Sequence, residues 1–164
     1  MRGFDRHPPD PPGPDDIVIG SLEDEAALGR AMATMGAAVH LAADADPEAD
    51  WESLLGANII GTRDVHGAAR RAGVRRVVFA SSSHVGRIDT REGRIASASR
   101  ARAAPDLYGV SKAFGEALGR YYADRHGLSV IWGRGEPERG LPCRGTMTSA
   151  RRPARHRPTM KETT

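Results

Sequence analysis

A tyrosine and a lysine four residues apart form the most informative pattern, in Tyr108-Gly109-Val110-Ser111-Lys112. On a helix, residues i and i+4 share one face. A cation beside a phenol stabilises the phenolate, so we expect the pKa of Tyr108 to fall from about 10 towards neutral pH. A phenol with a lowered pKa can act as a general base on a substrate hydroxyl. An ordinary surface pair is the alternative, because so short a motif specifies function weakly.

The identity of the cation supports the catalytic interpretation. The chain holds 24 lysines and arginines, and only Lys112 and Lys161 among them are lysines. The forked guanidinium of arginine cannot replace a compact ammonium that must also meet a ribose. A lysine at position 112 in so arginine-rich a sequence therefore stands out.

A run of hydroxyl groups follows the clearest strand pattern, which is VRRVVFA at 74–80. The run is Ser81-Ser82-Ser83, and His84 comes next. Ligands of open parallel sheets bind at the carboxyl ends of strands, where a serine hydroxyl could hold a reacting oxygen beside the tyrosine. Strand termination by serine, a good turn former, is the alternative.

Two further polar residues are candidates for the site. Asn58 lies on the apolar face of a long expected helix, and a buried amide needs hydrogen-bond partners. It could hold backbone near the active site or cap a neighbouring loop. Asp5 follows Met1 to Phe4, and at the end of a strand it could accept a hydrogen bond from a ribose hydroxyl. Taken alone, Asp5 is more simply a loop carboxylate.

Periodicity and capping signals predict the elements that position these residues. Helices are expected from Ser21, with Asp24 in a capping box, to Gly36, then over 49–72 and 107–126. The last helix shows an apolar stripe that we expect to be buried, made of Val110, Phe114, Ala117, Leu118 and Tyr121. Strands are expected at 17–19, 38–42, 74–80 and 128–132, and a surface loop at 86–105.

Strands that alternate with helices predict right-handed crossovers and a parallel sheet covered on both faces. The fold class is therefore α/β, an incomplete doubly wound sheet of the Rossmann-like kind, over residues 1–132. Residues 133–164 carry eight basic and three acidic residues without periodicity. We expect this basic tail to be disordered.

Composition excludes several classes of protein. The 164 residues fit one domain, and no apolar run is long enough for a transmembrane helix. The Pro-rich start is not a secretory signal, so a cytoplasmic location is expected. A single cysteine, Cys143, rules out an internal disulfide, and the six histidines lack paired metal-ligand spacing. Of these, His40 is expected in the core and His66 on a helix surface.

Together these motifs resemble the extended short-chain dehydrogenase/reductase superfamily, and within it the NAD-dependent epimerase/dehydratase group. The segments FASSSHV, ANIIGT and LYGVSKAFGEALGRYYADRHGL look most like those of uronate dehydrogenases. The resemblance runs from about Phe4 to Ile131. It implies an oxidoreductase that passes a hydride from a sugar or sugar acid to NAD, in preference to NADP.

The resemblance also implies a role for each site residue. Tyr108 would be the base, Lys112 its ribose-binding partner and Ser82 the third catalytic group. Ser82, Ser83 and His84 would contact the substrate. The cofactor would be held by Asp5, Ser21, Leu22, Leu41, Ala42, Ala43, Asn58, Tyr108 and Lys112. A homodimer through the helices that carry Asn58 and Tyr108 is a further implication.

The sequence departs from the family pattern at both ends. It contains no Gly-x-x-Gly-x-x-Gly spacing, the loop whose backbone N–H groups hold a pyrophosphate. The strand-end pattern also breaks down after Ile131. We therefore expect a truncated copy that starts inside the family's second strand, with an out-of-frame tail that genomic sequence in the other frames would reveal.

Two alternatives to an enzyme remain from the sequence. One is a catalytically inactive remnant or partner-binding protein with the same fold, favoured by the missing glycine loop. The other is nucleic-acid binding through the arginines at 151–157, but charge runs are usually solvated and no aromatic residue is interleaved. We therefore expect no nucleic-acid and no membrane partner.

Overall fold

The computed structural model describes residues 1–8, 14, 16–86, 104, 106–135 and 146–150. The elements follow one another along the chain as β1 (Arg2–Asp5), β2 (Asp16–Ile19), α1 (Glu25–Met32), β3 (Ala37–His40), α2 (Trp51–Leu54), the π-helix η1 (Leu55–Ile60), α3 (Gly61–Arg71), β4 (Arg76–Ser82), the 3-10 helix η2 (Ser83–Gly86), α4 (Leu107–His126), β5 (Ser129–Gly135) and β6 (Thr146–Ala150). Most of the loop expected at 86–105 lies outside the described residues.

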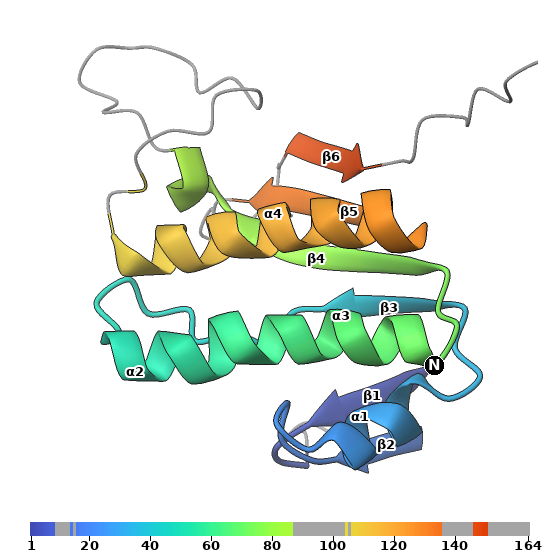
Figure 1. Ribbon diagram of the computed structural model, residues 1–164. Helices are drawn as coiled ribbons and strands as arrows, with labels where there is room; N and C mark the ends of the chain where they lie inside the picture. The colour runs from blue at the N-terminus through green and yellow to red at the C-terminus, as the bar shows by residue number, and fades with distance from the viewer. Residues whose placement is uncertain (9–13, 15, 87–103, 105, 136–145, 151–164) are drawn as a thin grey trace, which may run out of the picture.

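The strands form two sheets (Figure 1). Strands β1 and β2 pair in parallel, and β3, β4 and β5 form a second parallel set in that order. Strand β6 adds to β5 in antiparallel orientation. The Rossmann-like α/β fold predicted from the sequence is confirmed. The tail expected to be disordered contains strand residues at two places, namely the last residues of β5 and the whole of β6. Residues 136–145 and 151–164 of the tail lie outside the described residues.

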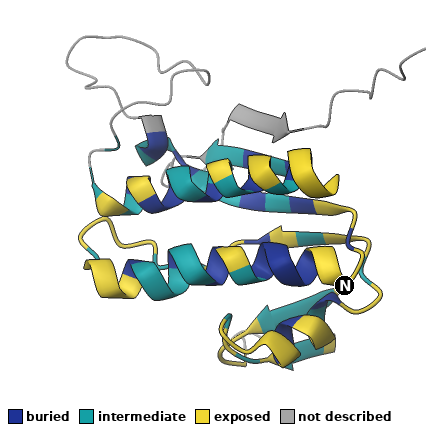
Figure 2. Ribbon diagram, viewed as in Figure 1, coloured by how far each residue is buried: buried dark blue, intermediate teal, exposed yellow. Residues whose placement is uncertain are grey.

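Among the described helices, α1, α3 and α4 pack on one face of the strands and enclose a single core. The strands alternate accordingly: Val77 and Phe79 of β4 are buried, whereas Val39 of β3, on the opposite face, is 64% exposed. Figure 2 shows this alternation of burial along the strands. We expected helices to cover both faces of the sheet. In the part of the chain that the structure describes, helices cover one face.

Local signals set the helix boundaries with two corrections, both in α1, which ends at Met32 and not at Gly36. Helix α1 begins after Asp24, whose side chain accepts from the backbone N–H of Ala27, so Ser21 is not its cap. The helix expected at 49–72 runs unbroken from 51 to 71 as α2, η1 and α3. Helix α4 has the predicted bounds and ends at Gly127, whose φ of 71° is easy only for glycine.

The prediction that the apolar stripe forms the buried face of α4 is wrong. Val110 and Tyr121 are about half exposed, at 46% and 52%. The buried face carries Gly115 and Gly119 instead. A Cβ at position 115 would lie 2.3 Å from the Phe79 ring, so α4 approaches β4 and β5 at a distance that only glycine allows.

Three side chains with ambiguous sequence signals are placed by the fold. Trp51, a large apolar side chain, is 47% exposed at the start of α2. His66, expected on a helix surface, is fully buried, with its Nδ1 2.9 Å from the carbonyl of Thr62. His40 is in the core as predicted. None of the described helices has the length and apolar character needed to cross a membrane.

Candidate functional site

The three candidate catalytic side chains come together where β4 ends and α4 begins. Ser82 is the last residue of β4, and its side chain is hydrogen-bonded to that of Tyr108. Asp106 caps α4, which places Tyr108 in its first turn and Lys112 one turn later on the same face. The parallel sheet therefore brings together groups 26 and 30 positions apart in the sequence, counted from Ser82 to Tyr108 and to Lys112.

Lys112 is buried, at 4% exposed, beneath this cluster. Its Nζ donates to the carbonyl oxygen of Ala80 at 2.9 Å and lies 5.6 Å from the centre of the Tyr108 ring and 5.2 Å from that of Phe79. Burial disfavours the charged ammonium and lowers the pKa of Lys112 to about 8. The lysine is thus oriented by the strand and near the point of losing its proton at mildly alkaline pH.

The pKa of Tyr108 shifts in the direction opposite to our expectation. Burial raises the pKa of the phenol, and the nearby Asp106 carboxylate also raises it, while the hydrogen bond to Ser82 opposes both. The expected lowering by Lys112 is wrong here, because the ammonium is directed to the Ala80 carbonyl.

The predicted substrate residues Ser83 and His84 begin η2, directly after Ser82. The backbone N–H of His84 donates to Ser82 Oγ at 3.2 Å, and its ring meets the Tyr108 ring edge-on with centres 5.6 Å apart. Its Nδ1 lies 2.7 Å from Asp106 Oδ2. Asp106, which sequence reasoning missed, therefore caps α4 and orients His84; its position before the helix pattern was the available signal.

Asn58 is buried in η1 and joins two segments of the site. Its Oδ1 accepts from the backbone N–H of Asp44 at 2.8 Å, and its Nδ2 donates to the Asp44 carbonyl at 2.9 Å and to Ser111 Oγ at 2.9 Å. Ser111 Oγ in turn donates to the Tyr108 carbonyl at 2.7 Å. These contacts combine the two roles open from the sequence, since Asp44 lies in the loop after β3 and Ser111 lies on the helix of Tyr108. Short π-helical segments such as η1 are frequent at functional sites.

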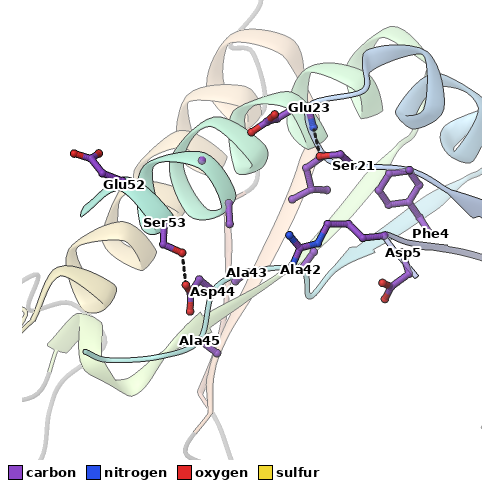
Figure 3. A pocket seen from close by; sticks show the side chains of 15 residues that line it. Phe4, Asp5, Ser21, Glu23, Ala42, Ala43, Asp44, Ala45, Glu52 and Ser53 are labelled. Atoms are coloured by element: carbon purple, nitrogen blue, oxygen red, sulfur yellow. Dashed lines mark hydrogen bonds between the residues drawn. The ribbon is translucent and has the colours of Figure 1, made fainter. Parts of the chain in front are cut away.

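A pocket of about 690 Å³ opens beside the cluster, at the carboxyl ends of β1, β2 and β3. Figure 3 shows side chains from these three strand ends directed around one space. The predicted cofactor residues that line it are Asp5, Ser21, Leu22, Ala42 and Ala43. Leu41 does not line it, and neither do Asn58, Tyr108 and Lys112.

Several lining residues were missed from the sequence because nothing local marks them: Phe4, Arg6, Glu23, Asp44, Ala45, Glu52, Ser53, Gly56 and Ala57, with Gly20 beside them. The Oγ of Ser53 donates to the Asp44 carboxylate, which closes one wall. Asp5 Oδ1 accepts from the backbone N–H of His7 at 3.1 Å. Tertiary packing alone brings this wall together.

The pocket suits the nucleoside part of a dinucleotide. Asp5 offers a carboxylate for ribose hydroxyls, while Leu22, Ala42 and Ala43 offer small apolar surfaces for a base. Arg6 is the cation among the lining residues, and the chain has no glycine-rich loop whose N–H groups could hold a pyrophosphate. The described residues therefore fit one half of NAD well.

Comparison with known proteins identifies the family. The model of the NAD dependent epimerase/dehydratase family matches residues 2–140. The chain belongs to this family. Among curated relatives, it is 45% identical over 127 residues to an L-arabinose 1-dehydrogenase (NAD(P)(+)) of Haloferax volcanii, covering 71% of this chain and 50% of that one. It is 36% identical to a uronate dehydrogenase of Pseudomonas syringae, with 71% and 42% covered.

Solved structures of the family agree. A uronate dehydrogenase variant from Agrobacterium tumefaciens, crystallised with NAD, superposes with a TM-score of 0.69 at 39% identity, over 79% of this chain and 48% of that one. The chain thus spans about half the length of the relatives it matches. The family match at residues 2–140 covers β1 to β5, the Tyr108 helix and the pocket described above.

Proposed function

We propose that this chain carries the nucleoside-binding and catalytic parts of an NAD-dependent dehydrogenase acting on a sugar or sugar acid. The gathering of Ser82, Tyr108 and Lys112 at the carboxyl edge of β4 carries the proposal. Relatives named for arabinose and uronate oxidation support the substrate class, and a relative crystallised with NAD supports the cofactor.

The roles follow from the geometry. The base is the phenolate form of Tyr108, which accepts the proton of the substrate hydroxyl, and the raised pKa of the phenol assigns this step to alkaline pH. Ser82, bonded to the phenol, holds the substrate oxygen beside it. Lys112 uses one N–H on Ala80 and keeps two for the phenol side of the site and a ribose. When bound, NAD accepts the hydride from the sugar carbon.

Substrate recognition is assigned to Ser83 and His84, which follow Ser82 on η2. Asp106 holds the Nδ1 side of the His84 ring, so the Nε2 side remains for a sugar hydroxyl or carboxylate. On the cofactor side, Asp5 takes the ribose, and the pocket residues 21–22 and 42–43 enclose the base, with Leu41 next to them.

Dimerisation through the long helix at 51–71, which carries Asn58, and through α4 belongs to the same proposal. The side chains of Val110 and Tyr121 are exposed on the surface of α4 and are apolar. The alternative from the sequence was that they pack inside the monomer. An exposed strip of this kind is typical of protein–protein contacts.

An inactive protein with the same fold is the second candidate. It is favoured by the absence of a glycine-rich spacing from these 164 residues. In that case Ser82, Tyr108 and Lys112 would be present but would catalyse no reaction, and the protein would act by binding a partner.

Two measurements separate the candidates. Calorimetry tests NAD binding, and NADH formation tests turnover of galacturonate, glucuronate and L-arabinose. The enzyme proposal expects NAD binding and turnover that falls about 1,000-fold in Tyr108→Phe, the loss of one general base. NAD binding weaker than millimolar with no turnover of any of the three would establish the inactive protein instead.

A further inference from the structure

Helix α4 packs on β4 and β5 through a face of small residues (Figure 1). Apart from one lysine, its buried residues are glycine, serine or alanine: Gly109, Ser111, Lys112, Gly115, Gly119 and Ala123. Small side chains let the helix come close to the strands, but they give it few projecting groups that interlock with the sheet. Apolar packing therefore fixes the position of α4 along its own axis only weakly.

Glu116 joins α4 to both of these strands. It lies about one turn after Lys112, on the helix face that also carries Tyr108. Its Oε1 accepts from Ser81 Oγ of β4 at 2.6 Å and from Arg134 Nε of β5 at 2.7 Å, and its Oε2 accepts from Arg134 Nη2 at 2.6 Å. Ser81 and Arg134 are register partners in neighbouring strands, so one carboxylate ties the helix to two strands at the same level.

The ion pair of Glu116 and Arg134 is largely withdrawn from water. The two side chains are 11% and 15% exposed, and the guanidinium fork holds both carboxylate oxygens. Two parallel hydrogen bonds fix the direction of the carboxylate as well as its distance. The hydrogen bond to Glu116 raises the pKa of Arg134, so the guanidinium stays charged. Separating the pair would leave either charge without compensation, which makes this contact a durable one.

Two further contacts join α4 to the end of β4, and both involve groups that the proposed reaction uses. The side chain of Tyr108 is hydrogen-bonded to that of Ser82, and Lys112 Nζ donates to the Ala80 carbonyl at 2.9 Å. In the proposed reaction the phenolate takes up a proton and the lysine meets a ribose, so both contacts change. Glu116 exchanges neither a proton nor a ligand in these steps, and its contacts persist.

We infer that Glu116, held by Arg134, is a positioning residue that keeps α4 in one axial position on β4. The tyrosine and the lysine of α4, about two turns and one turn before Glu116, thereby stay opposite Ser82 and Ala80 throughout the reaction. The inference rests on the proposed function for the reaction it serves. The restraint itself is a property of the fold, and it is measurable without turnover.

Titration of Lys112 by NMR tests the restraint. The chain has two lysines, Lys112 and Lys161, so labelling lysine Cε with carbon-13 gives two signals, which Lys112→Met assigns. In the original protein, burial lowers the pKa of Lys112 to about 8. Glu116→Asp conserves the charge but shortens the side chain by one methylene, which breaks the fit to Arg134. We expect α4 to shift, water to reach the ammonium and Lys112 to bind its proton at least about tenfold more tightly.

Two other variants complete the test. Ser81→Ala removes one hydroxyl and no charge, and is expected to strengthen proton binding by Lys112 about threefold, the scale of one neutral hydrogen bond. This variant decides the question if Glu116→Asp does not fold. Asp124→Glu is the matched control, because it changes a carboxylate of an exposed ion pair on the same helix by one methylene. It is expected to leave the titration of Lys112 unchanged, and thermal unfolding confirms the fold of each variant.

Unchanged proton binding by Lys112 in folded Glu116→Asp and Ser81→Ala would overturn the inference, because Glu116 would then be merely structural. An equal change in Asp124→Glu would overturn it too, as a general loosening of the helix. In turnover assays, kcat of Glu116→Asp is expected to fall about tenfold or more, with KM for NAD within about twofold of the original. Failure of the proposed function is seen separately, as an original protein without turnover in which Lys112 still responds to Glu116→Asp.

Discussion

The catalytic cluster and the cofactor pocket are built in different ways, although both lie at the carboxyl edge of the strands. Ser82 and Lys112 are buried and tied by hydrogen bonds to Tyr108 and Ala80. The pocket is formed by strand ends whose residues, such as Asp5 and Ser21, are exposed. The proposed catalytic groups are thus pre-positioned, while the proposed nucleoside-binding groups stand at an open edge of the strands.

Among the changes that leave Tyr108 in place, the largest effect is expected from the buried lysine. Lys112→Met keeps the shape of the side chain and removes its charge, so turnover should fall at least about 100-fold if the cluster is catalytic. The measurement is NADH formation from galacturonate, with thermal unfolding to confirm the fold. Turnover within about twofold of the original protein would show that the cluster is structural.

The same substitution should change the alkaline stability profile. The folded-state pKa of Lys112 is lowered to about 8, so deprotonation above pH 8 relieves the cost of burying its charge. Stability is therefore expected to rise between pH 8 and 10, by up to about 2 kcal/mol. Urea denaturation should show this rise in the original protein and lose it in Lys112→Met.

Acid should lower the free energy of unfolding through His40. Burial, with smaller contributions from His66 and Lys112, lowers its pKa to about 3. The unfolded histidine binds a proton near pH 6.5 and the folded one does not, so stability is present above pH 6.5 and is lost as pH falls. The loss approaches about 1.4 kcal/mol per pH unit below 6.

Urea denaturation between pH 7 and 4.5 measures this slope. His40→Asn, which keeps a polar side chain near Thr62, should reduce it, and His126→Asn at an exposed position should not. An unchanged slope in His40→Asn would assign the acid sensitivity to other groups.

Two glycines give a matched test of packing in the two regions. A Cβ at Gly115 would lie 2.3 Å from the Phe79 ring, which borders Lys112, whereas one at Gly56 on the pocket wall would have its nearest neighbour at 3.7 Å. We expect Gly115→Ala to destabilise the fold by about 2 kcal/mol and Gly56→Ala to change stability by less than about 0.5 kcal/mol. Equal effects would show that both regions tolerate movement alike.

The smallest effect is expected in the pocket. Asp5→Ala removes a proposed ribose acceptor and should weaken NAD binding about tenfold, the scale of one hydrogen bond to a charged group. Turnover at saturating NAD should change little. Calorimetry measures the affinity, with Asp124→Ala on the far part of α4 as the control. A loss of turnover without a loss of affinity would contradict the division between cluster and pocket.

Much of this architecture followed from local patterns. The bounds of α4, the strands around 17–19 and 74–80 and the burial of Asn58 were all predicted correctly, because caps, stop signals and β-branched runs are written within a few residues. The burial of α4 was predicted wrongly. Its apolar stripe is the conspicuous signal, yet the helix packs through Gly115 and Gly119, whose role depends on the strands beneath.

By itself the sequence determined the family, the order of strands and helices and the candidate catalytic residues, since residue types and short spacings encode them. Only the tertiary structure decided that the Tyr108 pKa rises, that Asp106 orients His84 and that Asp44 and Arg6 join the pocket. Desolvation, ring orientation and edge pairing depend on which distant segments meet, and no local pattern records those distances.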